Sequence, residues 1–339
     1  METKNLDNAP QTAEEKDIVL RVRDLHVHYE TDEANVWAVN GVSFDLERGG
    51  TLGLVGETGA GKTTTALAIM QLVPDPPGVI RGGEIYFQGK DVIKNTEKEN
   101  QRLRGNEITM IFQDPMTALN PTMTVGKQLV EVIRRHDRVS KAEAEKRAKE
   151  MLEIVGVKSD RFNDYPHEFS GGMKQRVVIT MALLCNPTLL IADEPTTALD
   201  VTIQAQVLEI ISDLQKKYKM SMILITHDLG VVAETCDKVA VMYAGQIIES
   251  GTVHDIYLNP RHPYTKGLFD SIPRIDSTAE KLVPIEGLTP NMAEPPTGCY
   301  FHPRCKYCQE ICKKEAPPVV GGGHAVRCHF PLEEKGVTE

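Results

Sequence analysis

Short hydrophobic runs alternate along the chain with longer segments in which apolar and polar residues recur at helical spacing. The short runs are bounded by turn or polar residues and predict buried strands at 51–55, 108–112, 189–192 and 222–225. The longer segments predict helices at 65–70, 170–184 and 203–218. This alternation predicts an α/β fold with a mostly parallel sheet, whose ligand-binding side chains lie at the carboxyl ends of the strands.

Three further stretches predict strands, and one charged stretch predicts a group of helices. The additional strands are expected at 18–29, 42–46 and 83–89. From Val125 to Val155, charged residues interleave with apolar residues at helical spacing. We therefore expect a helical subdomain inserted at about 115–180.

The glycine-rich segment 56–64 joins the strand at 51–55 to the helix at 65–70. Gly56 followed by Gly61, Lys62 and Thr63 is the P-loop spacing, in which backbone N–H groups surround a phosphate. A chance glycine-rich turn is the alternative, but the strand–loop–helix context favours nucleotide binding. Lys62 would neutralise phosphate charge, and Thr63 would offer a hydroxyl to Mg²⁺. The expected nucleotide contacts here are Gly56, Glu57, Thr58, Gly59, Ala60, Gly61, Lys62, Thr63 and Thr64.

Polar side chains follow three of the predicted strands. Asp193 and Glu194 follow the strand at 189–192, where nucleotide-binding proteins place a carboxylate for Mg²⁺. We expect Asp193 to hold the metal and Glu194 to orient or deprotonate an attacking water. Gln113 and His227 follow the strands at 108–112 and 222–225. The alternative for Asp193 and Glu194 is a charged strand end without a chemical role, and the alternative for His227 is a structural histidine.

The order of these motifs resembles that of ABC-type ATPases over residues 18–255. The discriminating segment is Ser170-Gly171-Gly172-Met173-Lys174-Gln175, which other P-loop families lack, although Met173 stands where the family most often has Gln. The resemblance implies a P-loop ABC-type ATPase domain that uses ATP and Mg²⁺ and forms a head-to-tail dimer. Ser170 and Gly172 of one subunit would contact the γ-phosphate bound by the P-loop of the other.

The same resemblance implies roles for residues outside the P-loop. Gln113 would contact Mg²⁺ or water, His227 would hold the γ-phosphate and the water, and Asp200 would couple the two sites of the dimer. Tyr29 matches the aromatic residue that stacks on adenine, with a core or surface tyrosine as the alternative. The implied catalytic set is Glu194, His227 and Gln113, and the implied Mg²⁺ set is Thr63, Gln113 and Asp193.

Composition and charge restrict the location and the partners. The chain has 339 residues and a formal net charge of -10, which argues against a surface built to bind nucleic acid. It has no apolar run long enough to span a bilayer and no apolar signal segment at the N-terminus, so we expect a cytoplasmic protein. The length predicts two domains, 18–255 and 256–339, after a disordered leader at 1–17.

Cysteines crowd the C-terminal region. In a reducing compartment such a cluster is more typical of a metal site than of disulfides. The Cys305-Lys306-Tyr307-Cys308 spacing suits zinc, while four thiolates from irregular loops suit zinc or an iron–sulfur cluster. The region from Asn259 to Cys305 is similar to the C-terminal extension of the dipeptide/oligopeptide importer subgroup. That similarity implies a small metal-binding domain with a structural [4Fe–4S] cluster, Zn²⁺ being the alternative, on Cys299, Cys305, Cys312 and Cys328.

The resemblance as a whole implies an ATP-hydrolysing subunit that powers the import of di- or oligopeptides. It implies two transmembrane permease subunits, a paralogous ABC ATPase in a heterodimer, and an extracytoplasmic peptide-binding protein that acts indirectly. It places the chain on the cytoplasmic face of the cell membrane. The alternatives are nickel import by the same subgroup and a soluble ABC-type ATPase that is not coupled to transport.

Overall fold

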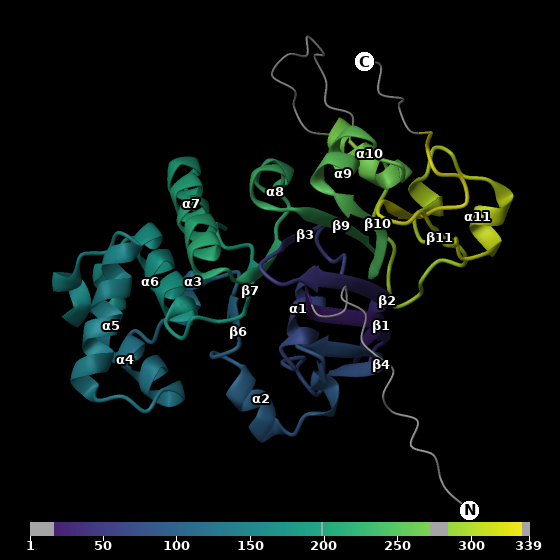
Figure 1. Cartoon of the computed structure of the whole chain (residues 1–339). Helices are drawn as coiled ribbons and strands as arrows, with labels where there is room; N and C mark the ends of the chain where they lie inside the picture. Colours follow the sequence, from purple (N-terminus) through teal and green to yellow (C-terminus); the bar gives the residue numbers. More distant parts are fainter. Residues whose placement is uncertain (1–16, 198, 272–283, 334–339) are drawn as a thin grey trace, which may run out of the picture.

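Two β-sheets with surrounding helices make up the computed structural model, which describes residues 17–197, 199–271 and 284–333 (Figure 1). Residues 1–16 of the predicted leader and Ala198 lie outside the described residues. The strands are β1 Ile18–Glu30, β2 Asn35–Glu47, β3 Thr51–Val55, β4 Gly78–Phe87, β5 Lys90–Asp91, β6 Ile108–Ile111, β7 Leu189–Asp193, β8 Ser221–Ile225, β9 Lys238–Tyr243, β10 Gln246–Thr252, β11 Val319–Val320 and β12 Ala325–Arg327. The α-helices are α1 Lys62–Ile69, α2 Glu97–Leu103, α3 Pro115–Ala118, α4 Val125–His136, α5 Lys141–Ile154, α6 Gly171–Leu183, α7 Val201–Tyr218, α8 Leu229–Thr235, α9 Val253–Leu258, α10 Pro263–Asp270 and α11 Glu310–Lys314.

The larger sheet has the strand order β11-β12-β10-β9-β3-β8-β7-β6. Its strands β6, β7, β8, β3 and β9 pair in parallel, while β10, β12 and β11 add antiparallel pairs. Every residue of β3, β7 and β8 is buried, because both faces of the sheet are covered. Leu189 and Ile191 contribute to one hydrophobic core and Leu190 and Ala192 to the other. The apolar runs in the sequence therefore predicted these strands correctly.

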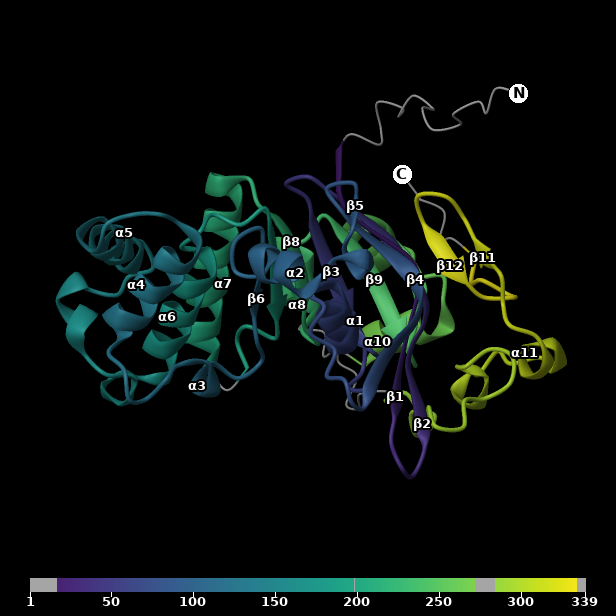
Figure 2. The same cartoon turned by 90° about the horizontal axis from the view of Figure 1, so that it is seen from below.

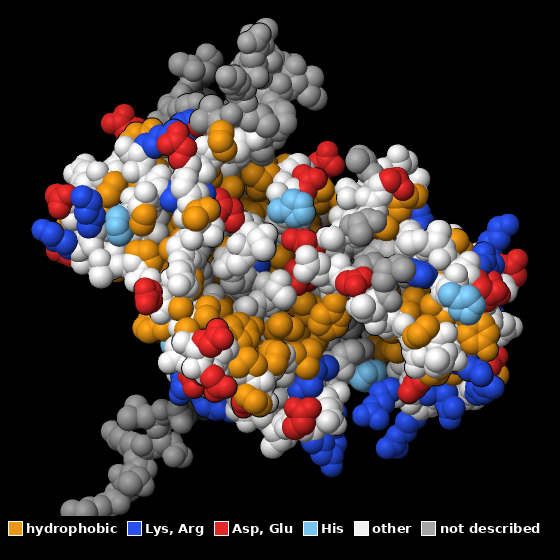
Figure 3. All heavy atoms as spheres, turned by 180° about the vertical axis from the view of Figure 1, so that it is seen from behind, with side chains coloured by type: hydrophobic (Ala, Val, Ile, Leu, Met, Phe, Trp, Pro, Cys, Tyr) orange, Lys and Arg blue, Asp and Glu red, His pale blue; other side chains and the backbone are white. Residues whose placement is uncertain are grey.

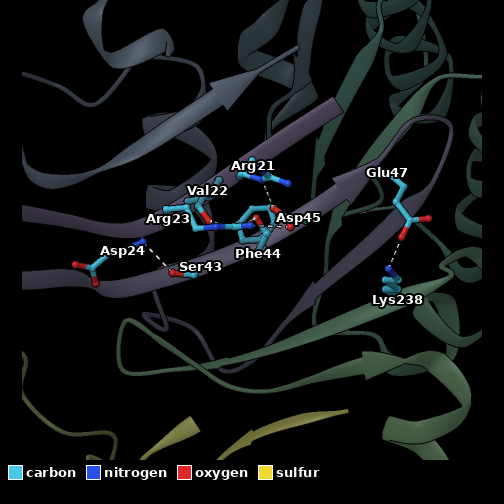
Figure 4. A network of polar contacts seen from close by, with 9 residues as sticks. All are labelled: Arg21, Val22, Arg23, Asp24, Ser43, Phe44, Asp45, Glu47 and Lys238. Atoms are coloured by element: carbon cyan, nitrogen blue, oxygen red, sulfur yellow. Dashed lines mark hydrogen bonds and ion pairs between the residues drawn. The ribbon is translucent and has the colours of Figure 1, made fainter. Parts of the chain in front are cut away.

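The smaller sheet is antiparallel, with the order β2-β1-β4-β5. The strands predicted from the sequence overlap β1, β2 and β4 but not β5, and nothing in the sequence indicated that they form a separate sheet. Asp45 of β2 accepts hydrogen bonds from Arg21 and Arg23 of β1, at 3.3 and 2.7 Å (Figure 4). An ion pair of 2.6 Å between Glu47 and Lys238 joins the end of β2 to the start of β9 in the larger sheet. This ion pair thus links the two sheets where β2 ends.

Helices α3 to α6 gather at one end of the molecule (Figures 1 and 2). Their buried residues include Leu129 and Ile133 of α4 and Ala148 and Leu152 of α5. Each of these pairs lies four residues apart, on one face of its helix. The sequence predicted a helical segment at about 115–180, and these helices run from Pro115 to Leu183. Within the described residues, none of the helices combines the length and apolar character needed to cross a membrane.

The C-terminal region lies at the opposite end and continues the larger sheet (Figure 2). Strand β12 pairs with β10, with Val326 opposite Glu249. Tyr264 and Phe301 pack against Tyr243 at the end of β9, with ring centres 4.7 and 5.2 Å away. The region after residue 255 therefore shares a hydrophobic core with the preceding part of the chain.

Candidate active site

The P-loop lies between β3 and α1, as the sequence predicted. Gly56 and Gly61 have φ of 147° and 96°. A Cβ atom on Gly56 would collide with the carbonyl oxygen of Met242, and one on Gly61 with that of Ala38. Glycine is required at both positions by backbone conformation and by space.

Lys62 lies over the P-loop and is only 7% exposed. Its Nζ donates hydrogen bonds to the carbonyl oxygens of Gly56 and Glu57, at 2.7 and 3.0 Å. Burial lowers the pKa of Lys62, although Glu194, Asp193 and Glu57 act in the opposite direction. A bound anion would compensate the desolvation of this ammonium group, so the position favours phosphate binding.

Asp193, the last residue of β7, is 2% exposed and lies next to Thr63 of α1. Burial raises the pKa of Asp193, and a hydrogen bond from the Thr63 hydroxyl partly offsets this effect. A divalent cation would favour the ionised carboxylate in the same way. A carboxylate and a hydroxyl are oxygen ligands that suit Mg²⁺, so this pair fits the metal that the motifs imply.

Glu194 is the centre of a small hydrogen-bond network. Its Oε2 accepts bonds from Gln113 Nε2 at 3.0 Å and Thr197 Oγ1 at 2.9 Å, and its Oε1 lies 3.4 Å from His227 Nδ1. Burial acts to raise the pKa of Glu194, but the contacts with Thr197, His227 and Gln113 outweigh it and hold the pKa below its usual value. The φ of Glu194 is 45°, a strained conformation of the kind that recurs at functional sites.

A cavity of about 520 Å³ is lined by most of these groups, although its lining does not include Gly56 or Asp193. Its volume falls in the range of small-molecule sites. The sequence predicted most of its lining, which includes Tyr29, Thr58, Gly59, Ala60, Gly61, Lys62, Thr63, Thr64, Gln113, Glu194 and His227. The Tyr29 hydroxyl lies 3.4 Å from Thr64 Oγ1. A larger hollow of about 780 Å³ lies at the other end of β3, beside Thr51, and contains none of these motif residues.

Sequence reasoning missed several residues at this site. Val36, Ala38 and Met292 also line the cavity. The N–H of Trp37 donates to the carbonyl oxygen of Met292 at 2.9 Å, which brings the C-terminal region to the cavity wall. Val36 and Ala38 belong to the apolar run 36–39 at the start of β2, which was a usable strand signal, but the sequence around Met292 contains no such signal.

Ser170 and Gly172 are not among the described residues that line the cavity. Ser170 is the N-cap of α6, as the sequence predicted, and its Oγ accepts a bond from the N–H of Met173 at 3.4 Å. Asp200 caps α7, and its Oδ1 accepts a bond from the N–H of Ile203 at 3.0 Å. These two helix starts lie outside the cavity of their own chain.

Five C-terminal cysteines, Cys299, Cys305, Cys308, Cys312 and Cys328, are close enough to influence one another. Burial, together with the charges of Cys328, Cys305 and Cys312, raises the pKa of Cys299 to about 11. The N–H of Cys299 donates to the carbonyl oxygen of Cys312 at 2.8 Å. Among the described residues, however, no group of three or more His, Cys, Asp or Glu side chains is arranged to hold a metal ion. The thiols are neighbours without forming a ready-made ligand set.

Two families match the sequence. Residues 39–197 match the ABC transporter family, and residues 248–312 match the oligopeptide/dipeptide transporter C-terminal region. The chain is 56% identical over 304 residues to the oligopeptide transport ATP-binding protein OppD of Bacillus subtilis, covering 89% of this chain and 85% of that protein. It is 51% identical to the dipeptide transport ATP-binding protein DppD of the same organism, covering 91% and 94%.

The fold also matches a solved ATP-binding cassette. The cassette MJ0796, determined as a dimer in a post-hydrolysis state with bound ADP and Pi, has a TM-score of 0.62 and 25% sequence identity. The match covers 69% of this chain and 98% of that chain.

Proposed function

This chain belongs to the ABC transporter family, among the ATP-binding proteins of oligopeptide and dipeptide transport, and we propose that it hydrolyses ATP to power the import of di- or oligopeptides. The observation that carries the proposal is that Lys62, Glu194 and His227 line one cavity beside the P-loop. The C-terminal match, together with two relatives named for peptide transport, favours peptides over nickel.

ATP binds with its phosphates in the P-loop and its adenine against Tyr29. Gly59 and Gly61 let the backbone approach the phosphates, and Lys62 neutralises their charge. Thr63, Asp193 and Gln113 would hold Mg²⁺, which would supply positive charge to neutralise the phosphates. Glu57 bonds to Tyr264 through its N–H and to Arg304 through its side chain, so it acts by holding the P-loop in place.

Hydrolysis depends on Glu194, which accepts the proton of the attacking water. Its lowered pKa keeps the carboxylate ionised at neutral pH, as a base requires. Gln113 and Thr197 fix the position of Oε2, and His227 lies next to Oε1, where it can contact the water and the γ-phosphate.

The active form is a head-to-tail dimer. The N-terminus of α6, with Ser170 and Gly172, supplies N–H groups for the γ-phosphate bound by the other subunit. The position of Ser170 outside the cavity of its own chain supports this arrangement, and Asp200 at the start of α7 couples the two sites. We propose a paralogous ATPase as the second subunit.

The partners in the membrane are two permease subunits, fed by an extracytoplasmic peptide-binding protein. Phe112, 45% exposed, directly precedes Gln113 and offers an apolar contact close to the nucleotide. On the rear face of the molecule, exposed hydrophobic side chains gather centrally, while many Lys and Arg side chains lie towards the edges (Figure 3). We place the chain on the cytoplasmic face of the cell membrane and propose no nucleic acid partner.

For the C-terminal region, 256–339, we propose a [4Fe–4S] cluster on Cys299, Cys305, Cys312 and Cys328, with Zn²⁺ as the alternative. The mutual proximity of these thiols supports the proposal. Burial disfavours the bare thiolates of Cys299, Cys305 and Cys328, so a bound cation would be needed to stabilise them. Iron, sulfide and zinc are measured on protein purified without oxygen. About four irons and four sulfides per chain are expected, and one zinc without sulfide would contradict the cluster.

The transport function is tested by peptide uptake in cells that lack the chain. Wild type should restore uptake of a toxic tripeptide, and Lys62→Ala should not, because the P-loop loses its charge. Lys146→Ala, which removes an exposed lysine of α5, is the matched control and should restore uptake. Nickel uptake is measured in parallel. Restoration of nickel uptake without peptide uptake would refute the proposed cargo.

A further inference from the structure

A partly buried ion pair joins the C-terminal region to the P-loop. Arg304 ends the short 3₁₀ helix His302–Arg304, and its Nη1 and Nη2 contact the two carboxylate oxygens of Glu57 at 2.8 and 3.1 Å. The Arg304 side chain is 6% exposed and that of Glu57 is 27% exposed. A two-point contact between a planar guanidinium and a carboxylate fixes orientation as well as distance.

Arg304 is held in place by further contacts. Its Nε donates to the carbonyl oxygen of Glu286 at 3.1 Å, and its Nη2 to that of Ile285 at 3.3 Å. Its Nη1 donates to the Tyr243 hydroxyl at 3.3 Å. Five hydrogen bonds therefore match the five N–H groups of the guanidinium. Because Tyr243 ends β9, which pairs with β3, Arg304 is anchored to the sheet that carries the P-loop.

Glu57 is held on its backbone as well as on its side chain. Its N–H donates to the Tyr264 hydroxyl at 3.0 Å. Its carbonyl oxygen accepts bonds from Lys62 Nζ at 3.0 Å and from the N–H of Ala60 at 3.1 Å. A displacement of Glu57 would therefore displace a contact of the lysine that binds phosphate.

We propose that Arg304 is a positioning residue of the nucleotide site, which fixes the P-loop and Lys62 through Glu57 and thereby increases the affinity for ATP. The inference rests on the proposed ATPase function and deepens it. Among the described residues, those that line the cavity do not include Arg304, so it acts without touching the nucleotide.

The position of Arg304 also gives the C-terminal region a means to influence ATP binding. Arg304 directly precedes Cys305, whose N–H donates to the carbonyl oxygen of His302 at 3.3 Å. A change in the conformation of the loop that carries Cys305 would therefore be transmitted to the P-loop through the side chain of Arg304.

A double-mutant cycle tests the proposal on the full chain. ATP affinity is measured by titration in EDTA, which prevents hydrolysis, for wild type, Arg304→Ala, Glu57→Gln and the double variant. We expect each single change to raise the Kd at least tenfold, because each leaves a charged partner half-buried and unpaired. The Kd of the double variant should not exceed that of the single variant that binds ATP less tightly, because the two changes remove the same interaction. Arg304→Lys should recover part of the affinity.

Hydrogen exchange of the P-loop amides separates positioning from a general effect on folding. Arg304→Ala should speed exchange at residues 56–61. Arg327→Ala is the control, because Arg327 lies in the same region but bonds to the Ile247 carbonyl oxygen, at 3.4 Å. It should leave both the P-loop exchange and the Kd within twofold of wild type.

The outcomes distinguish this inference from the proposed function. A wild-type chain that does not bind ATP would refute the function and the inference together. If wild type binds ATP, then unchanged affinity in Arg304→Ala and Glu57→Gln, or strictly additive losses in the double variant, would overturn the positioning role alone. If Arg304→Ala does not fold, Glu57→Gln and Arg304→Lys carry the test.

Discussion

Replacing Glu194 by Gln should stop hydrolysis while leaving ATP binding intact. The substitution keeps the shape of the side chain. The amide oxygen can accept the two bonds that Gln113 and Thr197 now donate to Oε2, and the amide nitrogen can donate to Nδ1 of a neutral His227, now 3.4 Å from Oε1. The local geometry is therefore preserved, and what is lost is the ability to accept a proton.

The size of the effect follows from the role of a general base. Such a group contributes about 10²–10⁴-fold to a rate, which corresponds to about 3–5 kcal/mol at 1.36 kcal/mol for each factor of ten. Asp193 cannot take over easily, because it is 2% exposed and bonded to Thr63. We therefore expect the turnover rate to fall at least 100-fold.

Phosphate release is measured on the purified chain, at a concentration at which wild type turns over. ATP affinity and the dimer fraction are measured on the same samples, and the Glu194→Gln variant should accumulate an ATP-bound dimer. Glu145→Gln is the control, because it removes the carboxylate of a surface pair with Lys141, and it should behave as wild type. A Glu194→Gln variant that retains more than a tenth of the wild-type rate would refute the assignment of Glu194 as the base.

Three further substitutions test other parts of the structure. Glu249→Ala should lower the free energy of unfolding by about 2–5 kcal/mol in urea denaturation, because the buried carboxylate accepts bonds from the N–H groups of Arg261 and His262 and contacts His324; a loss below about 1 kcal/mol would contradict this. Thr63→Ala should leave ATP binding in EDTA unchanged but raise the Mg²⁺ concentration needed for hydrolysis, and an unchanged Mg²⁺ dependence would argue against the assigned ligand. Met292→Ala should raise the Kd for ATP with little change in the turnover rate, whereas Met292→Leu should bind as wild type; an unchanged Kd in the alanine variant would remove Met292 from the site.

Much of the site was predictable because its residues either follow one another in the sequence or follow the carboxyl ends of parallel strands. The P-loop, its strand and its helix follow one another in the sequence, so spacing alone predicted them. Gln113 and His227 are 81 and 33 residues from Glu194. They meet because all three follow parallel strands, and the carboxyl ends of such strands lie at one edge of the sheet.

The remainder could not be predicted because it depends on single contacts between distant segments. Arg304 and Glu57 are 247 residues apart, and neither belongs to a periodic pattern that would indicate a partner. Met292 reaches the cavity through a backbone contact with Trp37, for which the sequence has no signal. The separate antiparallel sheet was missed for a related reason, since alternation predicts that a strand exists but not which strand it pairs with.

The C-terminal contacts bear on what the boundary near residue 255 means. The two family matches cover 39–197 and 248–312, so the second match begins before this boundary. In the structure, however, the second part supplies Arg304 and Tyr264 to the P-loop residue Glu57, and Met292 to the cavity. Without that part, the Glu57 carboxylate and N–H would lose their partners and the aromatic core around Tyr243 would be exposed. The boundary near residue 255 therefore does not divide the nucleotide site, which is built from residues on both sides of it.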